Sequence, residues 1–250
     1  MSGRGPVSPR ITVAVAVRVL AQLRRDPRTL AMLLVLPVAL MVLLWWMFES
    51  SPGVFDRVGP GLLALFPFFV MFLVTSVTTL RERTSGTLER LLAMPTGRLD
   101  FLLGYALAFG LVAMLQSAMA VVASLTVLGL EIAGPIWLLL VVAVSDAVLG
   151  TALGLFVSAF ARTEFQAVQF LPAVVVPQIL LCGIIVPRSR LPEVLGSISD
   201  LLPLSYATDA MQTLSTSPRA SEVWPDLAVV LGFALVALAL GAVTLRRRTG

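Results

Sequence analysis

The sequence contains no histidine, no lysine and no asparagine, and it has a single cysteine. With only Cys182, the chain cannot form an intrachain disulfide. Without histidine, it lacks the most frequent general base and the commonest zinc ligand. A nucleophile–base pair and a glycine-rich nucleotide loop are also missing from the sequence. We therefore expect no catalytic residues, no metal site and no cofactor in this chain, and we do not expect it to be an enzyme.

Charge is also scarce. Only 13% of the residues are charged and 58% are hydrophobic, with a mean hydropathy of +0.97. Such a composition excludes an ordinary soluble domain, and the long continuous apolar runs disfavour a transmembrane β-barrel. The expected fold is an all-α polytopic membrane protein, a single domain over residues 1–250. The six predicted spans are residues 30–48, 61–80, a part of 101–130, 135–160, 165–186 and 227–245.

All 18 basic residues are arginine, a bias that suggests a GC-rich bacterial genome. Fourteen of them fall in the segments that are cytoplasmic if the N-terminus lies in the cytoplasm. The positive-inside rule then places both termini in the cytoplasm of a multi-pass protein of the bacterial plasma membrane. Because the arginines lie at span boundaries, they serve topology, and we expect no nucleic-acid partner.

Residues 8–27 are too polar to span a membrane. Arg18, Gln22 and Arg25 follow one another at helical spacing and form a polar stripe on an otherwise apolar helix. This pattern predicts an interfacial elbow helix, with arginines near anionic lipid head groups, that ends where Asp26 and Pro27 turn the chain into the first span. It serves either as a topogenic anchor alone or also as a contact for a cytoplasmic partner.

The loop at residues 187–226 is long and rich in leucine and proline. Residues 191–202 and 204–214 are predicted to form two short helices, neither of them long enough to span. They form either a re-entrant pair that dips into the outer leaflet or an ordinary loop packed on the surface, and their leucines favour the re-entrant pair.

Asp146 is the one formal charge inside a predicted span. An intramembrane carboxylate either contributes to a proton or cation path or forms hydrogen bonds with a neighbouring helix. Gln116, Gln169 and Gln178 allow the same two roles, as lining of a cargo path or as interhelical hydrogen-bonding groups.

The most polar stretch between two spans is "RERTSGTLERLLAMPTGR", residues 81–98. Leu88, Leu91 and Leu92 lie on one face of a predicted helix that Pro95 and Gly97 end. A helix of about two turns is unstable alone in water, so something must pack against it. The candidates are the membrane surface and a groove on a soluble partner.

Three stretches resemble signatures of ABC-2 type transporter permeases, the membrane subunits of exporters such as the daunorubicin-resistance systems. "RERTSGTLERLLAMPTGRLDFLLG" is similar to the signature between the second and third spans. "LPLSYATDAMQTL", residues 202–214, resembles a second signature before the last span, and "RRDPRTL" resembles the elbow before the first span. The resemblance covers nearly the whole chain in order and spacing.

The resemblance implies that two copies of a separate ATP-binding-cassette ATPase, which carries the ATP and Mg²⁺, act with this chain and a second permease, identical or related. In the family, the loop between the second and third spans forms a coupling helix seated on the ATPase, and a short loop between the fourth and fifth spans adds a second contact. The residues carried over to these contacts are Glu82, Gly86, Thr87, Leu88, Glu89, Arg90, Leu91, Leu92, Arg162 and Glu164.

The low charge of the spans favours an apolar or amphipathic cargo, such as a drug, a natural product or a lipid, moved outward. Two alternatives stay open. One is a polysaccharide-type exporter of the same family, which we expect to be richer in aromatic residues than the 8% found here. The other is an ATP-independent, proton-linked carrier that uses Asp146.

Overall fold

The computed structural model describes residues 8–84 and 98–246. Within these ranges the regular elements are α-helices and short 3₁₀ turns, without a strand. Six helices are long and apolar enough to cross a membrane, in agreement with the six predicted spans. They are α2 (Pro27–Met47), α3 (Pro52–Thr84), α5 (Arg98–Thr126), α6 (Ile136–Val157), α7 (Glu164–Leu181) and α10 (Trp224–Arg246).

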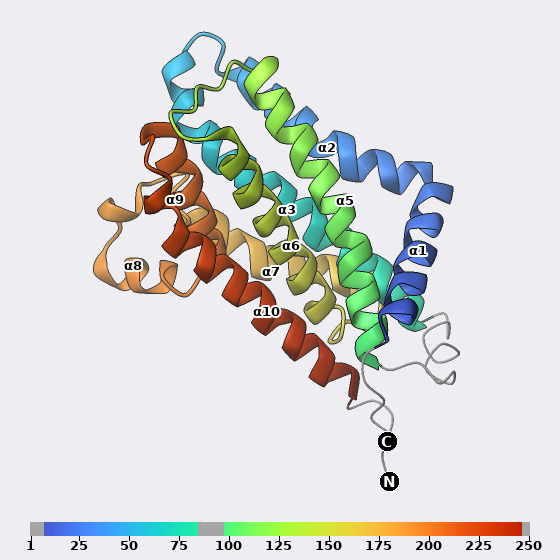
Figure 1. The fold of residues 1–250 in the computed structure, drawn as a ribbon. Helices are drawn as coiled ribbons and strands as arrows, with labels where there is room; N and C mark the ends of the chain where they lie inside the picture. The colour runs from blue at the N-terminus through green and yellow to red at the C-terminus, as the bar shows by residue number, and fades with distance from the viewer. Residues whose placement is uncertain (1–7, 85–97, 247–250) are drawn as a thin grey trace.

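Helices α3 and α6 form the centre of the bundle, and α2, α5, α7 and α10 surround them (Figure 1). About two thirds of the apolar window of α3 is buried within the protein, compared with 17% in α2 and in α7. The outer helices therefore leave most of their apolar surface for lipid or for another protein chain.

Two glycines explain how closely α6 approaches α3. A Cβ atom on Gly150 would lie 2.4 Å from the Phe68 carbonyl oxygen, and one on Gly154 would lie 2.6 Å from that of Phe72. Small residues four positions apart allow two membrane helices to bring their backbones together. Because both pairs advance in the same chain direction, α3 and α6 run parallel.

Two helix ends differ most from the predicted spans. Helix α3 begins at Pro52, nine residues before the predicted start, because Phe55 packs in the core and Pro60 lies inside a continuous helix. Prolines are tolerated in membrane helices, where neighbours and local adjustments satisfy the freed carbonyl. Helix α7 ends at Leu181, not at residue 186, since Gly183 adopts a positive φ of 96° and turns the chain.

The predicted elbow helix is α1 (Pro9–Arg25). Asp26 ends it and also caps α2, accepting hydrogen bonds from the Thr29 backbone N–H (3.2 Å) and hydroxyl (2.7 Å). In Figure 1, α1 lies beside the first half of α5. The two helices touch at Gly104, where an added Cβ would lie 2.6 Å from the Val15 Cβ. The elbow is therefore packed on the helix bundle along one of its faces.

The two short helices predicted after the fifth span are α8 (Glu193–Ser199) and α9 (Pro203–Thr216), accompanied by the 3₁₀ turns η1 (Arg188–Arg190) and η2 (Ala220–Glu222). Helix α9 packs against α3, α6, α7 and α10, and most of its apolar side chains are buried. This burial accounts for Leu204 and Leu214, whereas Leu195 and Leu201 remain exposed. The depth of the pair in a membrane stays a prediction.

Candidate functional site

The predicted cytoplasmic end of the bundle is the end at which α3 finishes and α5 begins. An ion pair there joins the elbow to the last turn of α3: Arg18 Nη2 lies 2.9 Å from Glu82 Oε1. Both side chains are largely buried, with Glu82 12% exposed, and Gln22 also lies within hydrogen-bonding reach of Glu82. Two residues of the predicted polar stripe, Arg18 and Gln22, therefore contact α3, although Gln22 is exposed, as Arg25 is.

A second ion pair joins the same turn of α3 to the start of α7. Arg81 donates from Nε and Nη2 to the two carboxylate oxygens of Glu164, at 2.7 and 2.9 Å. Two parallel bonds of this kind fix the orientation of both groups. Next to it, the Arg162 backbone N–H donates to the Gln166 side chain at 2.8 Å. The short 158–163 loop is thus attached to α3.

A third contact involves α5, the helix that follows the 85–97 segment in the chain. Asp100, in the first turn of α5, accepts hydrogen bonds from the Ser8 backbone N–H (2.7 Å) and the Thr12 hydroxyl (3.4 Å). We call these three contacts, Arg18–Glu82, Arg81–Glu164 and Ser8/Thr12–Asp100, the anchor contacts. They connect α1 and α7 to the two helix ends from which the predicted coupling segment departs.

The structure thus brings Arg18, Gln22, Glu82, Arg162 and Glu164 to one end of the bundle. The other residues that the resemblance assigns to coupling lie outside the described residues, and their role stays a prediction. They are Gly86, Thr87, Leu88, Glu89, Arg90, Leu91 and Leu92.

The residues suggested for a cargo path do not form one group. Gln116 and Asp146 are fully buried, and their side-chain polar atoms have no hydrogen-bond partner in the described part of the chain. Gln169 is exposed on α7. Gln178 has a structural contact, because its Oε1 accepts the Leu204 N–H at 3.2 Å at the start of α9.

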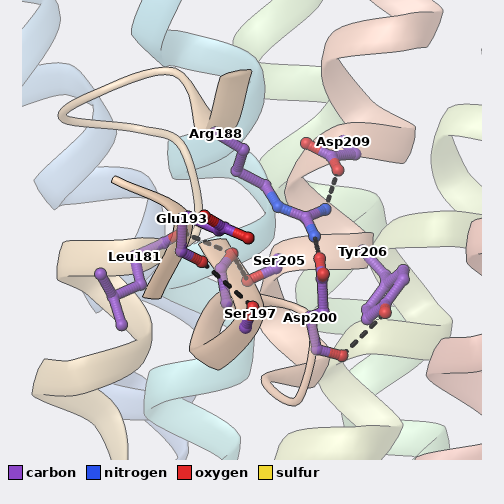
Figure 2. A network of polar contacts seen from close by, with 9 residues as sticks. Leu181, Arg188, Glu193, Ser197, Asp200, Ser205, Tyr206 and Asp209 are labelled. Carbon is purple, nitrogen blue, oxygen red and sulfur yellow. Dashed lines mark hydrogen bonds and ion pairs between the residues drawn. The ribbon is translucent and has the colours of Figure 1, made fainter. Parts of the chain in front are cut away.

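At the opposite, predicted outer end, Arg188 is the centre of a network that sequence reasoning missed (Figure 2). Its guanidinium forms ion pairs with Asp200 and Asp209 and lies 5.3 Å from the centre of the Tyr206 ring. The Tyr206 hydroxyl donates to the Asp200 carbonyl at 2.8 Å. Tyr206 and Asp209 belong to the stretch that resembles the second family signature, and this resemblance could have drawn attention to these two positions.

Burial and opposite charge act against each other in this network. Burial raises the pKa of Asp209 above its ordinary value, although the charge of Arg188 partly opposes the effect. For Arg188, burial lowers the pKa, but the two carboxylates outweigh burial and raise it, so the guanidinium remains charged. Ser199 continues the network by donating to the Leu181 carbonyl at 2.9 Å. The network therefore joins the end of α7, helix α8 and helix α9.

Comparison with known proteins identifies the group to which these features correspond. The family model described as "ABC-2 type transporter" matches residues 11–214. ABC transporter G family member 20 of Dictyostelium discoideum is 26% identical over 196 residues, which are 77% of this chain and 27% of that protein.

Two relatives come from Escherichia coli. The probable multidrug ABC transporter permease YbhS is 26% identical over 156 residues, or 62% of this chain and 41% of that protein. The inner membrane transport permease YhhJ is 25% identical over 194 residues, or 76% of this chain and 52% of that protein. The matched part of this chain thus spans about half the length of these relatives or less.

Proposed function

The chain belongs to the ABC-2 type transporter family, and from this premise we propose that it is the permease subunit of an ATP-driven exporter. A membrane transporter subunit follows from the family and the six spans. The finer proposal is that a separate ATPase docks at the predicted cytoplasmic end and drives outward movement of an apolar or amphipathic cargo. The observation that carries it is the set of anchor contacts around the 85–97 segment.

The anchor contacts connect the 85–97 segment to several helices, so they can transmit a movement of that segment to them. A displacement of the 85–97 segment acts on α3 and α5 through the chain, on α1 through Arg18–Glu82, and on α7 through Arg81–Glu164. Helix α3 in turn packs on α6 over the closely approaching backbone at Gly150. ATP binding on the partner then favours one of two arrangements of the spans, which is a population shift driven by differential binding.

We further propose that two ATPase copies bind two permeases, this chain and an identical or related one, in a bacterial plasma membrane with both termini cytoplasmic. In this proposal ATP and Mg²⁺ are held by the ATPase. The names of two relatives contain the word multidrug, and the scarcity of charge in the spans agrees with a drug-like or lipid-like cargo.

One observation favours a second candidate function. Both carboxylate oxygens of Asp146 are buried in α6 and lack a hydrogen-bond partner among the described residues. A proton-linked carrier would use such a group. It predicts transport that follows a proton gradient without any ATPase and that is lost in Asp146→Asn.

Co-purification with the ATPase tests the proposal. We expect Leu88→Asp in the full-length chain to abolish retention of the ATPase, because a carboxylate would replace the apolar side chain of the predicted coupling helix. Leu201→Asp is the matched control, since Leu201 is 72% exposed at the opposite end. Retention of the ATPase by Leu88→Asp at the control level, with transport intact, would refute the coupling role.

A further inference from the structure

A cavity of about 260 Å³ opens at the predicted outer end, away from the anchor contacts and from the Arg188 network. It lies between the end of α2, the start of α3 and the 127–135 loop after α5, segments that meet at the top of Figure 1. The lining consists of Trp45, Phe48, Glu49, Phe55, Asp56, Leu128, Gly129 and Glu131.

The walls are largely aromatic, and their rings pack in or against the protein core. Phe55 is buried in the main hydrophobic core, and Trp45 and Phe48 pack against that core. Their packing fixes the ring orientations before any ligand arrives, so binding would cost little ordering of these side chains. The electron-rich faces of aromatic rings attract cations, and indole does so most strongly.

The charged residues that line the cavity are all acidic. Glu49, Asp56 and Glu131 are exposed, and none of the eight lining residues is basic. None of these three carboxylates forms an ion pair within residues 8–84 and 98–246. A group of carboxylates without ion pairs, next to apolar walls, raises the local concentration of cations.

The geometry disfavours a metal ion as the occupant. In the described part of the chain, no three acidic side chains converge closely enough to hold a metal. A small inorganic cation also gains nothing from the apolar ring faces, since it keeps its water. A cation that carries methyl or ethyl groups around its nitrogen uses both features, the rings for its apolar surface and the carboxylates for its charge.

We infer that this cavity is a binding site for a quaternary ammonium group. Its volume lies just below the ~300–1,000 Å³ of pockets for drug-sized ligands, which suits a small head group rather than a whole amphiphile. Such a group occurs both in free organic cations and in choline lipids. The inference concerns binding by the permease alone, so it stands or falls independently of the ATPase partnership.

The test measures equilibrium binding of radiolabelled choline and tetraethylammonium to the full-length chain in phosphatidylglycerol nanodiscs at 150 mM salt. We expect saturable binding of both, and none of 3,3-dimethyl-1-butanol, the neutral analogue of choline. Trp45→Leu should weaken choline binding about tenfold. The exposed pair Glu49→Gln and Glu131→Gln, changed together, should weaken it about fivefold without affecting folding.

Two controls lie close to the site. Trp46→Leu replaces the neighbouring indole, which is 67% exposed and does not line the cavity, and Glu193→Gln removes an exposed carboxylate elsewhere. Both should bind choline like the unmodified chain. The lipid of the nanodiscs is then changed from phosphatidylglycerol to phosphatidylcholine. If choline is displaced, the natural occupant is a lipid head group; if choline binding is unchanged, the occupant is a free cation. Both outcomes support the site.

Three results would overturn the inference. The first is the absence of saturable binding of either cation. The second is equal binding of the neutral analogue, which would indicate a merely apolar cavity. The third is displacement of choline by stoichiometric Ca²⁺ or Mg²⁺ together with unchanged binding in Trp45→Leu, which would indicate a metal site.

Discussion

Removing Arg18 tests the connection between the elbow helix and α3. In Arg18→Gln, Glu82 stays at 12% exposure without its cation. At 2.9 Å the Coulomb attraction is about 6 kcal/mol for an effective dielectric constant of 20, and desolvation offsets much of it. Loss of one partner costs ~0–1 kcal/mol for an exposed pair and ~3–5 kcal/mol for a buried one. Because Arg18 keeps 29% exposure, we expect an intermediate cost of about 2 kcal/mol for this pair.

The assay separates stability from coupling. Thermal unfolding of the purified permease gives the stability loss, for which we expect a fall in Tm of about 4–8 °C for 2 kcal/mol in a chain of this size. ATP hydrolysis by the reconstituted complex, with and without cargo, gives coupling. We expect cargo stimulation to fall in Arg18→Gln while basal hydrolysis by the ATPase persists, because the nucleotide site is on the partner.

The exchange of charges provides the decisive comparison. In the double variant Arg18→Glu and Glu82→Arg, the pair is restored in reverse, and stimulation should recover to at least half of the unmodified level. Arg219→Gln breaks an exposed pair at the outer end, at 3.5 Å from Glu222, and should change neither quantity. If the exchanged pair performs no better than either single variant, the contact does not act as an anchor.

Three further predictions concern packing, the outer network and pH. Gly150→Ala should lower Tm by about 2–10 °C, because the new Cβ would lie 2.4 Å from a backbone oxygen of α3. The control Gly110→Ala, whose Cβ would have no atom within 4 Å, should leave Tm unchanged or raise it. Equal Tm values for both variants would contradict the close packing of α3 and α6. Arg188→Gln should make α8 susceptible to limited proteolysis by removing both ion pairs, and Arg190→Gln, its neighbour without an ion pair in the described ranges, should not. Hydrogen bonds from Thr29 lower the pKa of the Asp26 carboxyl group in the folded chain. The stabilisation by Asp26 is therefore complete above about pH 4 and is lost as the pH falls through the lowered folded-state pKa. The Tm difference between the unmodified chain and Asp26→Ala should shrink only below about pH 4, and a difference that is constant down to pH 2 would refute this.

Much of the fold could be predicted because bilayer thickness sets the length of apolar runs. The six spans and the elbow followed from this length and from helical spacing. The start of α3 was missed because the spans were read from charge-free runs, whereas this helix extends beyond its apolar run and includes Asp56 and Arg57. The end of α7 depends on the backbone of Gly183, and composition alone does not reveal that conformation.

The site was less predictable because its contacts join residues distant in the chain. Periodicity placed Arg18 on a polar stripe, but its partner Glu82 is 64 residues away, and a stripe is equally compatible with lipid head groups. Arg188 has partners 12 and 21 residues away, across a turn whose path no local pattern specifies. The aromatic cavity likewise combines residues from α2, α3 and the 127–135 loop.

The most direct test of the central claim is transport of a fluorescent amphiphile by the purified permease in liposomes. The account predicts transport only when the ATPase and ATP are present, with loss in Leu91→Asp and little change in Asp146→Asn. Transport by the permease alone along a proton gradient, abolished by Asp146→Asn and unaffected by ATP, would contradict it.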